Sequence, residues 1–341
     1  MKTKIYQVNQ DDFDTIINHS AQVIKAGGLV VFPTETVYGI GANALDSHAS
    51  KKIYQVKGRP SDNPLIVHIA NHKDVYLYAK HISQEAKLLM DAFWPGPLTL
   101  VLTKTDLVPQ AITGGLNTIA IRFPRNPIAQ ALITSAKLPI CAPSANISGT
   151  PSSTTFDHVF KDLNGKVDVI IDGGMSHVGL ESTVLDLTGK TPVILRPGAI
   201  TKSMIEKALN KKISAPDTFI EDESIPKAPG MKYRHYAPKG QVTLLDGNHQ
   251  QIKKFIKDLN DKNIGLIASD ELCDLLSDYH TFKLGSIHDI DTIAKNIFLA
   301  LRTMDNLDIK TIYIEAIKDQ ELGTAIMNRL LKAANRNIIH L

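Results

Sequence analysis

The sequence is poor in the residues that would mark a secreted or a membrane protein. It has two cysteines among 341 residues, Cys141 and Cys273, and no CxxC pair. Two such distant thiols exclude a disulfide framework and a cysteine-rich structural zinc cluster. No stretch approaches the roughly 18 apolar residues that a membrane span needs, and Met1 to Asp12 lacks the apolar core of a signal peptide. We therefore expect a cytoplasmic protein that does not cross a membrane.

An excess of one charge is also missing. Lys and Arg total 38 against 35 Asp and Glu, which gives a formal net charge of +3. This charge is too small for a chain that wraps nucleic acid over its whole surface, so any anion site must be a local cluster. Hydrophobic residues make up 43% of the chain, enough for the cores of two domains of ordinary size.

Apolar patterning divides the chain into two α/β segments. Up to about Gly198, short β-branched runs alternate with amphipathic helical patterns. From Gln241 onward, strands and helices alternate again, which indicates a small parallel sheet. Between them lies a stretch rich in Pro, Gly and charge that has no apolar period. The predicted organisation is a first domain at 1–210, a linker at 211–239 and a second domain at 240–341.

The apolar runs also predict individual elements. In the first domain, strands are expected at Gly28 to Phe32, Leu98 to Leu102, Val167 to Ile171 and Thr183 to Leu187, and helices at Ala49 to Lys57, Ser83 to Phe93, Pro127 to Lys137 and Thr201 to Leu209. In the second, strands are expected at Val242 to Leu245, Ile264 to Ala268 and Thr311 to Glu315, and helices at Gln250 to Leu259, Ile290 to Met304 and Gly323 to Ala334.

A polar cluster follows the first apolar strand. Thr34, Glu35 and Thr36 come directly after Phe32-Pro33, where a strand end can open into a crevice. The two threonine hydroxyls could hold a small polar ligand, or they could simply be satisfied within a turn. The next residues, 39–44 (GIGANA), fit the GxGxxA dinucleotide pattern. The preceding strand ends several residues too early for a pyrophosphate on a helix N-terminus, so a dinucleotide site is not expected.

Two cations flank a glycine in Lys57-Gly58-Arg59, followed by a rigid Pro60. Arg supplies a planar fork, Lys a mobile point charge, and Gly lets the backbone approach, which together suit phosphate oxygens. A solvated basic turn is the alternative. His68 follows a strand-like run, and a lone histidine is more often structural than functional. Its role therefore depends on its neighbours.

Further polar groups stand at strand ends. Arg122 lies in an apolar strand, and a buried guanidinium needs an anionic partner, either an internal carboxylate or a ligand. Ser144 and Asn146 are separated by Ala145, so on an extended backbone their side chains share one face and could bind the same ligand. The sequence has no Walker A motif, HExxH pair or nucleophile elbow. Phosphate would therefore be held by side chains and turn amides.

Several of these stretches together resemble the signature of the threonylcarbamoyl-AMP synthase family. They are PTETVYG at 33–39, KGRPSDNPL at 57–65, the SxN of 144–146, GLESTV at 179–184 and LRPG at 195–198. Their order and spacing also match. Residues 228–238 (APGMKYRHYAP) and 323–334 resemble the linker and the end of the second domain in the two-domain form. The sequence departs from the pattern at 175–177 and at Ser153, outside the expected ligand contacts.

The resemblance implies an α/β fold: a YrdC-like twisted mixed sheet with helices, followed by a small Rossmann-like parallel α/β domain. It implies synthesis of L-threonylcarbamoyladenylate from L-threonine, bicarbonate or CO2, and ATP, with release of pyrophosphate. The product would supply N6-threonylcarbamoyladenosine in tRNA through the tRNA threonylcarbamoyl-transferase machinery, with a weak tRNA contact as a further expectation. Mg²⁺ would enter with ATP, without a metal site made by the protein alone and without an organic cofactor.

Carried over motif by motif, the resemblance also implies residue roles. The L-threonine pocket would contain Thr36, His68, Arg122, Ala142 and Ser182, with Arg122 on the carboxylate. Lys57, Arg59, Ser144 and Asn146 would be catalytic. The linker at 211–239 would act as an active-site lid. ATP would be bound by Lys57, Arg59, Asn63, Thr118, Ser144, Asn146, Ser152 and Arg196, with Arg234 and Tyr236 from the lid.

Two other functions compete with this one. YrdC-like folds also resemble proteins proposed to bind double-stranded RNA or tRNA on a concave basic face. The pairing of Ser144 and Asn146 with Arg122 favours a small enclosed pocket instead. A carbamoyl-transferring hydrogenase-maturation enzyme contains a similar domain, but its zinc-finger cysteines are absent from this sequence. The role of the second domain and the oligomeric state stay open.

Overall fold

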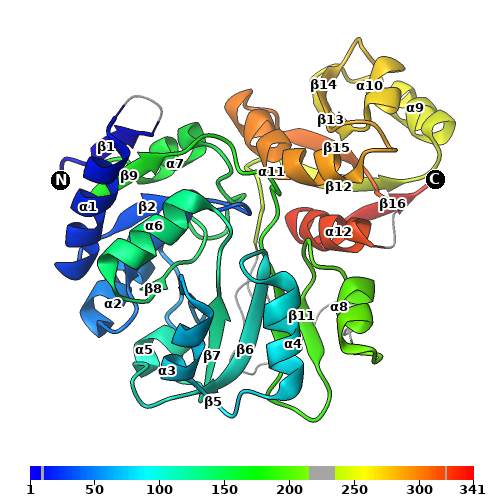
Figure 1. The fold of residues 1–341 in the computed structure, drawn as a ribbon. Helices are drawn as coiled ribbons and strands as arrows, with labels where there is room; N and C mark the ends of the chain where they lie inside the picture. The colour runs from blue at the N-terminus through cyan, green and yellow to red at the C-terminus, as the bar shows by residue number, and fades with distance from the viewer. Residues whose placement is uncertain (9–10, 215–234, 319–320) are drawn as a thin grey trace. The chain divides into compact units, whose positions relative to one another are not determined.

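The computed structural model describes residues 1–8, 11–214, 235–318 and 321–341 (Figure 1). They form two compact units, each described here by itself. The second unit contains the described residues from His235 onward and two short earlier segments, Gly149–Ser152 and Val178–Leu180. Both segments come from the sequence predicted as the first domain.

The first unit is built on one large mixed sheet. Its strand order is β1-β9-β2-β3-β8-β4-β7-β6-β10-β11, and β5 pairs with β6. Pairs such as β4–β7 and β6–β10 are parallel, whereas β6–β7 and β10–β11 are antiparallel. The strands are β1 (Lys4–Gln7), β2 (Val30–Phe32), β3 (Gly39–Asn43), β4 (Ile66–His68), β5 (Ala79–Lys80), β6 (Leu98–Lys104), β7 (Thr118–Arg122), β8 (Ile140–Cys141), β9 (Val169–Asp172), β10 (Thr183–Asp186) and β11 (Val193–Arg196).

Both faces of this sheet are covered, which explains its continuous apolar runs. In β2, Val30 and Phe32 belong to one buried cluster and Val31 to another, as the two-residue repeat of a strand requires. Helices α1 and α6 pack together over the cluster that contains Val30 and Phe32 (Figure 1). The helices and single 3-10 turn of this unit are α1 (Phe13–Lys25), α2 (Ser47–Lys57), η1 (His72–Asp74), α3 (Val75–Tyr78), α4 (Gln84–Phe93), α5 (Gln110–Thr113), α6 (Pro127–Ala136), α7 (Phe156–Leu163) and α8 (Lys202–Leu209).

Side-chain caps set where several of these helices begin. Asp46 accepts hydrogen bonds from the first amides of α2, and Ser83 caps α4. Asn126 caps α6, whose first residue is a proline that needs no hydrogen-bond partner. Helix α2 ends at Gly58 in the left-handed conformation, φ +62°, which places Lys57 and Arg59 on either side of the turn.

The second unit has a five-stranded parallel sheet in the order β14-β13-β15-β12-β16. Helices α9 and α10 share a buried cluster with β13, while α11 and α12 pack against each other (Figure 1). Its elements are β12 (Gln241–Asp246), α9 (His249–Asp258), β13 (Ile264–Ala268), α10 (Asp270–Asp274), β14 (His280–Lys283), α11 (Ile290–Asn306), β15 (Thr311–Glu315), α12 (Leu322–Ala333) and β16 (Ile338–His340).

The mixed sheet and the parallel sheet confirm the fold expected from the sequence. The strands expected at Ile264 to Ala268 and Thr311 to Glu315 have the same bounds in the structure. The edge strands β14 and β16 were not expected. Their residues are half-buried or exposed, so they carry no apolar run that could reveal them.

A buried arginine fastens one of the earlier segments to the second unit. Arg302 of α11 is 6% exposed, and its Nε and Nη2 donate to the Pro151 carbonyl oxygen at 3.0 and 2.6 Å. We expect Arg302→Ala to lower the free energy of unfolding by about 1.5–3 kcal/mol, the range for hydrogen bonds from a charged group. Urea denaturation measures this loss. Lys254→Ala, at an exposed cation of α9, is the control, and an equal change in both variants would contradict the role of Arg302.

Candidate active site

A row of polar side chains crosses the sheet of the first unit. His68 of β4 lies opposite Arg122 of β7, and Arg122 lies opposite Thr99 of β6. The register continues from Thr99 to Val184 of β10, and from Val184 to Arg196 of β11. Residues opposite one another on paired strands share a face at a spacing of about 5 Å. Pairing of distant strands thus brings together side chains that are far apart in the sequence.

Arg122 is the centre of this row and is 4% exposed. Its Nη1 donates to the Thr36 hydroxyl at 2.8 Å, and its Nη2 lies 2.7 Å from Glu35 Oε1. Its Nε is buried and has no hydrogen-bond partner among the residues that the structure describes. Such an orphaned donor is costly unless a ligand accepts from it.

Glu35 is the internal carboxylate that the sequence left as an alternative partner of Arg122. Burial raises the pKa of Glu35, but the charge and hydrogen bonding of Arg122 outweigh it, so the pKa lies below its ordinary value. Glu35 is therefore ionised at neutral pH. Thr34 ties the same turn together, because its hydroxyl donates to the Val37 carbonyl at 2.6 Å.

His68 is buried and neutral. Its Nδ1 lies 3.2 Å from the Ile66 carbonyl oxygen, and because a carbonyl can only accept, this contact requires the proton on Nδ1. Burial, followed by the charge of Arg122, lowers the pKa of His68 to about 3. The ring stands edge-on to Phe32, with the centroids 6.4 Å apart. At neutral pH, Nε2 is therefore an acceptor.

Ser182 and Arg196 contact each other directly. Arg196 Nη2 lies 3.1 Å from Ser182 Oγ and 3.0 Å from the Ser182 carbonyl oxygen. The Ser182 hydroxyl also lies 2.7 Å from Thr99 Oγ1. Arg196 was predicted to bind ATP and Ser182 to bind threonine. The structure places these two residues in one cluster.

Lys57 holds the turn that carries Ser144 and Asn146. It is 2% exposed, and its Nζ donates to the carbonyl oxygens of Ser144 and Asn146 at 2.6 and 2.5 Å. The two predicted side chains do meet, since Ser144 Oγ donates to Asn146 Oδ1 at 2.5 Å. The backbone turns tightly there, with Asn146 N donating to the Ser144 carbonyl at 3.0 Å. The expectation of an extended backbone is corrected on this point.

Arg59 organises the loop that precedes β4. Its Nη2 donates to Asn63 Oδ1 at 2.5 Å and to the Pro64 carbonyl at 3.0 Å. Thr118 begins β7, which runs parallel to β4, so Thr118 lies at the same end of these strands as Asn63. Ala142 follows β8, and its amide donates to the Ile66 carbonyl at 2.8 Å.

The remaining predicted ATP contacts belong to other parts of the chain. Ser152 is buried and lies in a segment that groups with the second unit. Tyr236 is 4% exposed, and its ring packs on Phe298 of that unit with the centroids 5.2 Å apart. Arg234 lies outside the described residues, as does most of the linker, so the lid role of 211–239 stays a prediction.

Glu35 and Thr99 contact predicted site residues but were not predicted as part of the site themselves. Glu35 had a signal, because a buried Arg122 requires a carboxylate and Glu35 adjoins Thr36. Thr99 had none, since a threonine in an apolar strand is ordinary and only the register β6–β7 places it beside Arg122.

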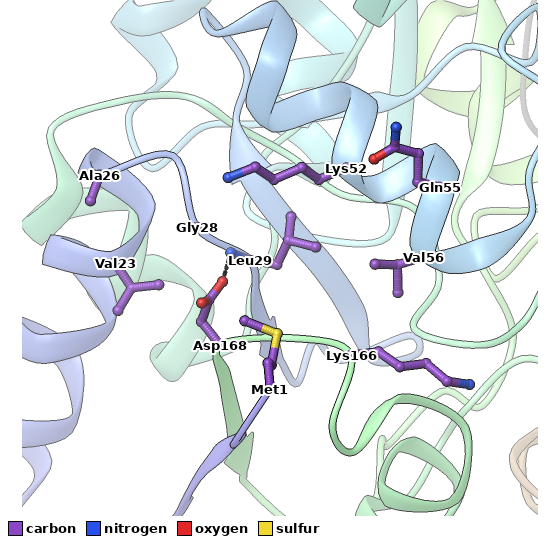
Figure 2. A pocket seen from close by; sticks show the side chains of 10 residues that line it. All are labelled: Met1, Val23, Ala26, Gly28, Leu29, Lys52, Gln55, Val56, Lys166 and Asp168. Atoms are coloured by element: carbon purple, nitrogen blue, oxygen red, sulfur yellow. Dashed lines mark hydrogen bonds between the residues drawn. The ribbon is translucent and has the colours of Figure 1, made fainter.

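A separate cavity of about 420 Å³ lies elsewhere in the first unit (Figure 2). Lys52, Lys166 and Asp168 line it, and Asp168 accepts from the Leu29 amide at 2.8 Å. None of the predicted site residues lines this cavity. Among the described residues, no three His, Cys, Asp or Glu side chains group as a metal site, and no helix is long and apolar enough to cross a bilayer.

Comparisons with known proteins identify the family. Residues 22–198 match the family model described as "Telomere recombination", and residues 200–335 match "Threonylcarbamoyl-AMP synthase, C-terminal domain". The threonylcarbamoyl-AMP synthase of Pyrococcus abyssi is 46% identical, over 95% of both chains. That of Bacillus subtilis is 42% identical, over 99% of this chain and 100% of the relative. The crystal structure of P. abyssi Sua5 complexed with L-threonine has a TM-score of 0.91 at 44% identity and covers both chains fully.

The buried, neutral His68 predicts a dependence of stability on pH. In the unfolded chain His68 protonates below about pH 6.5, whereas in the folded chain its pKa is about 3. The unfolded state binds more protons than the folded state between these two pH values. The contribution of His68 to the free energy of unfolding is therefore complete above pH 6.5 and falls as the pH drops. When the pH falls from 7.5 to 5.5, we expect this group alone to lower the free energy of unfolding by about 1.4 kcal/mol.

Urea denaturation at the two pH values measures the effect in the original chain and in His68→Gln. The loss on acidification should be about 1.4 kcal/mol smaller in the variant. His48→Gln, at an exposed histidine, is the matched control. Equal losses in the original chain and in His68→Gln would show that His68 is not held neutral.

Proposed function

We propose that this chain, which belongs to the threonylcarbamoyl-AMP synthase family, makes L-threonylcarbamoyladenylate from L-threonine, bicarbonate and ATP. The observation that carries the site assignment is the orphaned Nε of Arg122, a buried cationic donor beside the Thr36 hydroxyl. A ligand carboxylate would satisfy it. The double-stranded RNA-binding alternative is not favoured, because relatives that align over the whole chain are named as synthases.

The threonine pocket would occupy the row from His68 to Ser182. Arg122 would bind the amino-acid carboxylate, because Glu35 engages one Nη atom and leaves Nε to a second anion. The neutral Nε2 of His68 would accept a hydrogen bond from the threonine amine or hydroxyl. Thr36 and Ser182 supply hydroxyls, and Ala142 would lie against the threonine methyl group.

ATP would bind where β4 and β7 begin, on Lys57, Arg59, Asn63, Thr118 and the turn of Ser144 and Asn146. Lys57 donates to two carbonyl oxygens of that turn, which fixes the directions of the Ser144 hydroxyl and the Asn146 side-chain amide. Arg59 is anchored on Asn63, so its cationic face is held in a rigid loop. Arg196 would join the nucleotide to the threonine pocket through Ser182. Ser152, Arg234 and Tyr236 complete the proposed nucleotide contacts.

The reaction would proceed in two balanced steps. The threonine nitrogen forms a bond to the carbon of CO2, or of bicarbonate with loss of hydroxide, and gives up a proton to yield a carbamate. A carbamate oxygen then attacks the α-phosphorus as the bond to the β-phosphate oxygen breaks and pyrophosphate leaves. The carbamate is already nucleophilic and the leaving group is charged, so positioning and charge neutralisation dominate over acid-base catalysis.

Mg²⁺ is the metal ion that would accompany the ATP phosphates, where it would offset their charge. The product would pass to the tRNA threonylcarbamoyl-transferase machinery, with at most a weak tRNA contact by this chain. The cytoplasm is the proposed location.

Substrate dependence is the direct test of this function. With ATP and Mg²⁺, pyrophosphate release should require both bicarbonate and L-threonine. Serine should be poorer by about tenfold or less, because one lost methyl contact is worth roughly 1 kcal/mol. Leucine should be inactive. Release that is independent of threonine, or equal with leucine, would end the proposal.

Calorimetric titration tests the division of labour between the two arginines. Arg122→Ala should weaken threonine binding by about ten- to hundredfold, and Arg59→Ala should weaken ATP binding by a similar factor, because each loses a charge-assisted hydrogen bond. Arg122→Ala also leaves the buried Glu35 carboxylate unpaired.

The double variant Arg122→Ala/Glu35→Gln replaces the unpaired buried carboxylate by a neutral amide. It should recover stability while threonine binding stays weak. If the double variant regains threonine affinity, or if both arginine variants lose affinity for ATP alone, the assignment of Arg122 is wrong.

A further inference from the structure

A second cavity lies within the second unit, at the carboxyl edge of its parallel sheet. Its volume is about 710 Å³. Gly247 to Gln250 follow β12 directly, and Glu315 to Lys318 end and follow β15. The other lining residues are Ile287, in the connection after β14, and Ile290 and Ile293 in the first turn of α11. Open α/β sheets bind ligands in the crevice outside the carboxyl ends of their strands. The place and the size are those of a small-molecule site.

A buried carboxylate stands at the end of β15 and lines this cavity. Glu315 is 8% exposed, and its Oε1 lies 2.9 Å from His249 Nε2. Its Oε2 accepts from the Ser269 amide at 2.7 Å. These contacts fix both oxygens of the carboxylate. Each oxygen still has acceptor capacity, because an ionised carboxylate offers about four lone-pair sites.

The rest of the lining is mainly aliphatic. Ile287, Ile290, Ile293, Ala316 and Ile317 contribute apolar walls. Lys318 also lines the cavity, but its Nζ lies 3.7 Å from Asp246, so its charge is partly balanced. Asn248, His249 and Gln250 add polar groups at one end of the lining sequence. Apolar walls around a fixed carboxylate suit a ligand that has a flat apolar face and neutral hydroxyl donors.

We propose that this cavity binds a nucleoside, with its base between the isoleucine side chains and its ribose hydroxyls donating to Glu315. A strand-end carboxylate at the carboxyl edge of a parallel sheet is the group that such folds place on ribose hydroxyls. The sequence after β12 has a single glycine and no glycine-rich phosphate loop, so a nucleoside fits better than a dinucleotide. The site lies wholly in the second unit and is separate from the residues proposed for synthesis.

The test uses the full chain and two probes, adenosine and 2′,3′-dideoxyadenosine, in equilibrium dialysis. The chain should bind adenosine about tenfold or more tightly than the dideoxy compound, because the ribose hydroxyls donate to a charged acceptor. In Glu315→Gln this preference should shrink severalfold, since a neutral amide oxygen is the weaker acceptor. Asp278→Asn, at an acid 83% exposed in the same unit, is the matched control and should keep the preference.

Photolabelling with 8-azidoadenosine then locates the bound nucleoside by peptide mapping. Label should fall on peptides that contain 247–250, 287–293 or 315–318. Ile287→Asp, at a residue 46% exposed on the apolar wall, should abolish it without disturbing the core. Circular dichroism and pyrophosphate release by each variant check folding and report independently on synthesis. Label confined to the first unit, or an unchanged ribose preference in Glu315→Gln, would overturn the proposal.

Discussion

The buried ion pair between Arg122 and Glu35 is the interaction on which the candidate active site depends. Taking either charge out of water without the other would be strongly unfavourable. The pair therefore fixes the turn after β2 against the end of β7, although these segments are 87 positions apart in the sequence numbering. Because Glu35 engages Nη2 and Thr36 engages Nη1, the guanidinium has one orientation, and its Nε is left for a ligand.

Lysine and arginine elsewhere in the site act on the backbone. Lys57 donates to two carbonyl oxygens of the turn at Ser144–Asn146, and Arg59 donates to the loop that precedes β4. A basic cluster in the sequence thus has two functions at once: its side chains shape the loops, and its charge makes them attractive to phosphate. In the proposed site, this arrangement would hold phosphate without a glycine-rich loop.

The two units illustrate two ways of building a site on a sheet. In the first unit, a mixed sheet brings His68, Arg122 and Thr99 into register across strands, and these residues form the centre of the candidate site. In the second, a parallel sheet ends in loops that enclose an aliphatic cavity around one fixed carboxylate. The first arrangement suits recognition of a small charged molecule, and the second suits a larger molecule that is mostly apolar.

Local patterns in the sequence were enough to predict the fold class, about half of the strands and helices, and candidate residues for the site. Short continuous apolar runs such as Ile264–Ala268 and helix caps such as Asp46 depend only on neighbouring residues, so they can be recognised without knowledge of the partner strands. The polar motifs likewise stand at strand ends that their own neighbours define. Which of these residues contact one another became clear from the three-dimensional fold alone. Thr99 joins Arg122 through strand register, Glu35 reaches it across the sheet, and Ser152 groups with the second unit, because long-range pairing and packing leave no local pattern.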